Sequence, residues 1–125
     1  MICMAKDFFF DLESAKEVLP WLKEKIARLE ELGIRGRKAM EEYDIDSADT
    51  FTVEIQEILG QIHGKGIILR DLSEILVDFP AVINNMPSYL CWLPEEEGIE
   101  YWHYADEGFA GRKRISGNER ILSYL

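Results

Sequence analysis

The chain has 125 residues, with 14 Lys and Arg against 24 Asp and Glu, and a formal net charge of −10 at pH 7. This length predicts a single domain over residues 1–125, with a helical half at about 8–65 and a β half with a C-terminal loop at about 66–125. Excess acid repels the phosphates of nucleic acids and anionic lipids, and no apolar run is long enough to span a bilayer. We therefore expect no nucleic-acid partner and no membrane partner.

The cysteines and the first residues predict a cytoplasmic location. Cys3 and Cys91 are the two cysteines, and a single distant pair is not a disulfide framework. Residues 1–7 have neither the basic region nor the long apolar region of a secretory signal.

The first half of the chain predicts two helices. Asp11 has the side chain of an N-cap, and an apolar stripe follows it with residues alternately three and four apart. That stripe consists of Leu12, Ala15, Leu19, Leu22, Ile26 and Leu29. Pro20 predicts either a kink or a split in which it opens a second helical segment. Another helix begins at Asp46 or Ser47 and ends at Gly64 to Gly66, so we expect an antiparallel helical hairpin.

After Gly66 the pattern changes to short apolar segments separated by turn residues. Strands are predicted at 67–71, 75–79, 88–92 and 99–103, with turns at 84–87 and 94–98. These connections are too short for helical crossovers. The fold class predicted is therefore α+β, with the hairpin packed on an antiparallel meander of three to four strands.

Strand parity predicts large apolar side chains on both faces of this sheet. In the last strand Tyr101 and His103 point away from Trp102, and in the strand before it Tyr89 and Cys91 oppose Leu90 and Trp92. The hairpin can cover only one face. The C-terminal segment, a second subunit or a ligand must cover the other, and we expect a symmetric homodimer because two-fold pairing is the commonest oligomer.

Four short motifs in the second half resemble a known family. They are Asp78-Phe79-Pro80, Leu90-Cys91-Trp92, Trp102-His103 and Gly108-Phe109-Ala110-Gly111-Arg112. Together with the less specific first helix, they resemble the uncharacterised bacterial and archaeal family called domain of unknown function 2203. The resemblance implies no established activity. One departure is the turn at 93–98, where the family has a Gly-Glu turn, and this puts in doubt any role tied to an acid there.

The candidate site lies at the end of the sheet and in the glycine-rich loop. Aromatic bulk with one cation is typical of binding surfaces, so we expect a non-catalytic binding or interaction module for a small ligand or a protein. Its residues would be Trp92, Trp102, His103, Asp106, Phe109 and Arg112. The alternative is a small metal-dependent enzyme, such as a hydrolase, that uses His103 with Asp78 or Asp106.

The sequence alone assigns no metal and no cofactor. Asp78, Cys91, His103 and Asp106 are all ligand types, but no paired ligand motif joins them. The sequence alone assigns no catalytic residue either. The three cations at 112–114 stand beside many acids, so we expect them to pair with acids of this chain or its partner rather than with nucleic acid.

Overall fold

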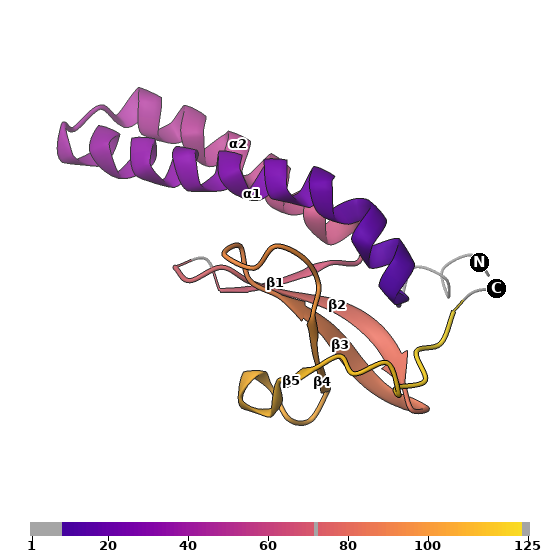
Figure 1. The fold of residues 1–125 in the computed structure, drawn as a ribbon. Coiled ribbons are helices and arrows are strands. Elements are labelled where there is room, and N and C mark those ends of the chain that lie inside the picture. Colours follow the sequence, from indigo (N-terminus) through magenta and orange to yellow (C-terminus); the bar gives the residue numbers. More distant parts are fainter. Residues whose placement is uncertain (1–8, 72, 124–125) are drawn as a thin grey trace.

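The computed structural model describes residues 9–71 and 73–123 as two long helices followed by a sheet (Figure 1). Helix α1 (Leu12–Glu41) and helix α2 (Ile45–Gly64) form an antiparallel hairpin. The hairpin lies across one face of the sheet and extends beyond it. This is the α+β arrangement that the sequence predicts.

Helix α1 begins at the predicted cap and continues without a split. Asp11 accepts the backbone N–H of Ser14 at 2.7 Å, and the Ser14 hydroxyl accepts the N–H of Asp11 at 3.0 Å. The helix then runs through Pro20 as far as Glu41. Figure 1 shows its axis bending in the first turns. Of the two arrangements predicted at Pro20, the structure therefore excludes the split.

Helix α2 begins slightly earlier than predicted and ends as predicted. Its N-cap is Asp44, whose side chain accepts the N–H of Ser47 at 3.2 Å. Gly64 is the last helical residue, and Gly66 has a positive φ of 84°, a conformation that glycine adopts without strain. The chain then enters the sheet at residue 68.

Five antiparallel strands form one sheet in chain order. They are β1 (Ile68–Asp71), β2 (Leu76–Ile83), β3 (Met86–Trp92), β4 (Tyr101–Tyr104) and β5 (Lys113–Arg114). Asn84 and Asn85, both at positive φ, make the two-residue turn between β2 and β3. The predicted meander is confirmed, with one additional strand of two residues, too short to leave an alternating pattern.

The apolar core lies between the hairpin and the sheet. Val77, Phe79, Leu90, Trp92 and Trp102 pack there against the buried stripe of α1 and against α2. The pairs Phe79 with Leu90 and Leu90 with Trp102 are direct cross-strand neighbours. This confirms that alternate strand residues separate into a core face and a second face.

The C-terminal segment adds to the same core. Ile115 and Ile121 pack against it, and Ile121 forms an isolated bridge with Ile83. The Trp102 indole N–H donates to Glu119 at 3.2 Å. This segment therefore helps to cover the core face of the sheet. In the described parts of the chain, neither helix is both long and apolar enough to cross a bilayer.

Candidate functional site

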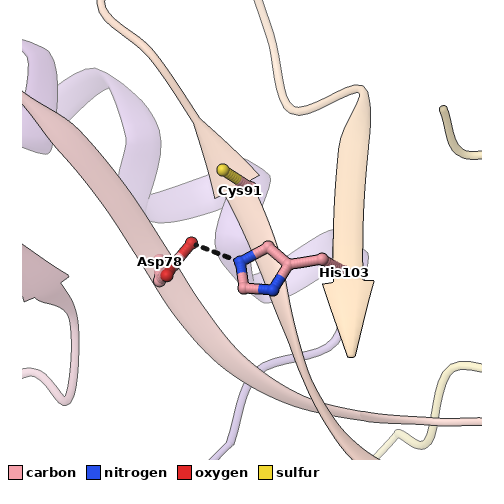
Figure 2. Close-up of side chains that lie close together, drawn as sticks. All are labelled: Asp78, Cys91 and His103. Atoms are coloured by element: carbon pink, nitrogen blue, oxygen red, sulfur yellow. Dashed lines mark hydrogen bonds and ion pairs between the residues drawn. The ribbon is translucent and has the colours of Figure 1, made fainter. Parts of the chain in front are cut away.

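Three ligand-type side chains meet on the sheet face that points away from the hairpin. Asp78 on β2 is paired with Cys91 on β3, and His103 on β4 reaches them from a diagonal position beside Cys91. One atom of each, a carboxylate oxygen, the thiol sulfur and a ring nitrogen, lies within 4.8 Å of the other two (Figure 2). The residues are 2%, 0% and 2% exposed. They form a compact buried group, called the Asp-Cys-His cluster below.

The imidazole of His103 is fixed through both ring nitrogens. Nδ1 lies 2.9 Å from the carbonyl oxygen of Tyr104, which only accepts, so Nδ1 carries a hydrogen. Nε2 lies 3.3 Å from Oδ1 of Asp78 (Figure 2). The ring of His103 is thus oriented with Nε2 toward the carboxylate of Asp78.

Asp78 is held from its other side by an arginine. Arg70 Nε donates to Oδ2 of Asp78 at 2.8 Å, leaving Oδ1 directed at His103. The hydrogen bond to Asp78 raises the pKa of Arg70 above its usual value. Arg70 also lies 4.9 Å from the centre of the Tyr89 ring, and that ring packs against His103. Arg70 and Tyr89 therefore cover one side of the cluster.

Cys91 is held in the same way by a second arginine. Arg112 Nε donates to Sγ of Cys91 at 3.3 Å, while its Nη2 donates to Glu96 at 2.5 Å. The guanidinium lies 4.1 Å from the centre of the Tyr101 ring and 5.3 Å from that of Phe109. Burial raises the pKa of the Cys91 thiol to about 11, although Arg112 opposes the shift. Cys91 is therefore a neutral thiol at neutral pH.

The glycine-rich loop explains how Arg112 reaches this position. Gly108 has φ of 70°, and Gly111 lies so close to the side chain of Glu107 that an added Cβ would overlap it. Only glycine fits both positions without strain or displacement. The short 3₁₀ turn η2 (Phe109–Gly111) ends at the residue before Arg112. The loop thus places Phe109 and Arg112 over the second face of the sheet.

Three of the six residues predicted for the binding surface come together. His103 lies in the cluster, Arg112 contacts its cysteine, and Phe109 stacks on Arg112. Trp92 and Trp102 lie in the core on the opposite face. Asp106 is exposed in the turn after β4 and makes no hydrogen bond within residues 9–71 and 73–123. Asp78 and Cys91, which the sequence offered only as metal-ligand types, complete the group.

Sequence reasoning missed Arg70 and Glu96. The register of the β1–β2 hairpin pairs Ile68 with Asp78, and Arg70, two residues further along β1, donates to Asp78 at 2.8 Å. Glu96 belongs to the turn that departs from the family pattern, yet its carboxylate anchors Arg112. The cations at 112–114 pair as expected with acids of this chain, namely Glu96, Glu107 and Glu100.

Each of the four motifs that carry the family resemblance supplies one side chain to this site. These are Asp78, Cys91, His103 and Arg112. The family model described as "Uncharacterized conserved protein (DUF2203)" matches residues 9–115. Comparisons with curated proteins and with solved structures gave no match. The match spans both helices and all five strands.

Proposed function

This chain belongs to the uncharacterised DUF2203 family, and we propose that it binds one transition-metal ion, of the Zn²⁺ class, through Asp78, Cys91 and His103. The observation that carries this is the convergence of an oxygen, a sulfur and a nitrogen ligand atom within 4.8 Å in a buried site. Mixed ligands of this kind suit zinc and its neighbours in the first transition series. Hard cations such as Mg²⁺ and Ca²⁺ prefer oxygen ligands alone.

The surroundings of the three ligands support metal binding. In metal sites the ligating histidine usually donates its other N–H to a carbonyl or carboxylate, and ligating carboxylates are themselves hydrogen-bonded. Here Tyr104 accepts from His103, and Arg70 and Arg112 donate to Asp78 and Cys91. These contacts leave Nε2 of His103 and Oδ1 of Asp78 facing each other beside Sγ of Cys91. The groups that would orient the three ligands by hydrogen bonds are thus present around them.

Charge and protonation also suit a divalent ion. A carboxylate and a thiolate together offer two negative charges, which match the charge of a divalent ion. A coordinating thiol is deprotonated outright, so the raised pKa of Cys91 does not prevent ligation. Of the two nearby cations, Arg112 is paired with Glu96, and the Arg70 side chain is 41% exposed and therefore screened by water.

Three protein ligands leave the fourth tetrahedral position for water or another small ligand. That arrangement is typical of zinc sites that activate water rather than purely structural ones. The metal-dependent hydrolase considered as the alternative from sequence would need this open position. Its residues would then be His103 with Asp78 and Cys91, without Asp106.

The test is cobalt and zinc titration of protein stripped with a chelator. We expect one equivalent of Co²⁺ to bind and to produce a sulfur-to-cobalt charge-transfer band that requires Cys91. The chain provides matched controls, because it has two cysteines and two histidines. Cys91→Ser and His103→Gln should abolish the band or weaken binding at least tenfold, whereas Cys3→Ser and His63→Gln should not. Protein that binds neither ion, or binds both unchanged after Cys91→Ser, would contradict the assignment.

A further inference from the structure

A groove begins beside the Asp-Cys-His cluster, at the next positions of the same strands on the same sheet face. Side chains on one face recur at every second residue. From the cluster toward the β2–β3 turn, β2 therefore places Pro80 and then Val82 on this face, and β3 places Tyr89 opposite Pro80 and Pro87 opposite Val82. These four residues line a groove of about 400 Å³. Its near end lies two residues along the strands, about 7 Å, from the three ligands.

The groove is apolar and partly open to solvent. Ala105, directly after β4, forms one side of it, and its N–H donates to the carbonyl oxygen of Pro87 at 3.0 Å. Pro87 and Ala105 are exposed, whereas Pro80, Val82 and Tyr89 are half-buried. None of the described residues that line the groove is charged. A concave apolar surface of this size is typical of sites that bind small organic groups.

Tyr89 connects the groove to the metal ligands and to a cation. Its ring centre lies 5.4 Å from that of His103, and the guanidinium carbon of Arg70 lies 4.9 Å from the Tyr89 ring. Arg70 uses its Nε to hold Asp78, and its side chain is 41% exposed. A ligand whose apolar part lies in the groove would therefore extend past Tyr89 toward both the metal and Arg70.

With a divalent ion bound, the charges around the cluster leave one positive charge. The ion is matched by the carboxylate of Asp78 and the thiolate of Cys91. Arg70 then has no acid to itself, because Asp78 is its one ion-pair partner in the described residues. Two further cations near the cluster are already paired with acids: Arg112 with Glu96, and Lys113 with Glu107. The metal-loaded site therefore favours a ligand with a single negative charge.

We propose that this site binds a small monocarboxylate that carries an apolar group, an inference that rests on the metal binding proposed above. The carboxylate pairs with Arg70 and occupies the open position of the metal, and the apolar group lies in the groove beyond Tyr89. Guanidinium and carboxylate match in shape as well as in charge. A phosphate monoester carries more than one negative charge at pH 7 and matches the single charge of the site less well.

Calorimetric titration of the Co²⁺-loaded protein with phenylacetate tests this inference. Phenylacetate should bind at least tenfold more tightly than acetate, which lacks the apolar group, and than phenylacetamide, which lacks the charge. It should also bind at least tenfold more tightly to the loaded protein than to protein stripped with a chelator, in which Asp78 balances the charge of Arg70. Binding should shift the visible absorption of the cobalt, because a carboxylate replaces water on the metal.

Two matched pairs of variants locate the ligand at saturating cobalt. Val82→Glu puts a like charge into the groove and should weaken phenylacetate binding at least tenfold, whereas Val53→Glu makes the same change at an exposed position of α2 and should not. Arg70→Gln should also weaken it at least tenfold, whereas Arg35→Gln, which removes an arginine paired with an acid on α1, should not. The sulfur-to-cobalt band of each variant shows that the ligand-bearing strands remain folded.

Four results would overturn the inference. Loaded protein with its sulfur-to-cobalt band intact that binds phenylacetate no better than acetate would remove the carboxylate site and leave the metal site standing. Tighter binding of phenyl phosphate than of phenylacetate would assign the ligand to phosphates. Dimerisation in sedimentation equilibrium that blocks phenylacetate binding would place a second copy in the groove. Protein that takes up no cobalt would contradict the metal assignment itself and, with it, the charge that selects the ligand.

Discussion

The two faces of the sheet are both buried, but by different means. The face toward the hairpin is covered by helices and a C-terminal segment, and its residues are almost all apolar. The other face has a polar centre, Asp78, Cys91 and His103, covered by side chains of the sheet itself and the loop before β5. The same three strands supply both faces through alternate residues. The first face thus holds the apolar core, and the second holds the proposed metal ligands.

Removing a large side chain from the apolar face should give the largest effect. Phe79 is fully buried and packs edge-to-face on Phe10, with ring centres 5.3 Å apart. Phe79→Ala should lower the free energy of unfolding by about 3–5 kcal/mol, because it leaves a cavity that the packed core cannot fill. Urea denaturation measures this loss of free energy of unfolding. Val82→Ala, on the same strand but on the other face and half-buried, should cost much less, and equal losses would remove the distinction between the faces.

The reactivity of the buried Cys91 thiol should show the next largest effect. Its pKa is raised by burial from 9.0 to about 11, which reduces the thiolate fraction near pH 8 about 100-fold. In the Cys3→Ser variant, Cys91 is the remaining thiol. We expect the metal-free folded form to react with a disulfide reagent at least about 100-fold more slowly than the same variant in urea. Similar rates with and without urea would show that the second face opens freely to solvent.

Replacing Arg112 should change the metal affinity more than the free energy of unfolding. Lysine lacks the fork that donates to Cys91 and Glu96 at once. Arg112→Lys should therefore weaken cobalt binding about 10–100-fold, as expected for the loss of an outer partner of a ligand. Arg114→Lys is the control, since Arg114 also stacks on Tyr101 but contacts Glu100 instead of the cysteine. If both variants bind cobalt equally, Arg112 does not position Cys91.

Sequence patterns predicted the structural features that are determined by residues close together in the chain. The cap at Asp11, the stripe of α1 and the turn at Asn84-Asn85 are each set by residues within a few positions of one another, so pattern alone finds them. Strand parity correctly separated Cys91 from Trp92 and His103 from Trp102. The extent of β2 beyond Pro80 and the two-residue β5 were missed, because neighbouring strands rather than local pattern determine them.

The site was only partly predictable, for a physical reason. Trp92 and Trp102 were included because aromatic residues are common to binding surfaces and cores, and sequence does not separate the two. The meeting of Asp78, Cys91 and His103 depends on the register of three strands, which spacing along the chain does not give. Glu96 and Arg70 act through contacts that likewise require the register and the loop conformation.

The smallest effect expected lies at the edge of the apolar face, at Glu119. Burial alone would raise the pKa of this carboxylate, but N–H groups of Ser116 and Gly117 donate to it and lower its pKa to about 2. Because the folded pKa lies below the unfolded value, its contribution is complete above about pH 4.5 and is lost as the pH falls toward 2. Glu119→Gln should remove about 1 kcal/mol at pH 7 and less at pH 3, by urea denaturation. Asp106→Asn, an exposed carboxylate without hydrogen bonds in the described residues, should show no such difference. A loss in Glu119→Gln that is the same at both pH values would mean that its packing, and not its charge, supports the C-terminal segment on the core face.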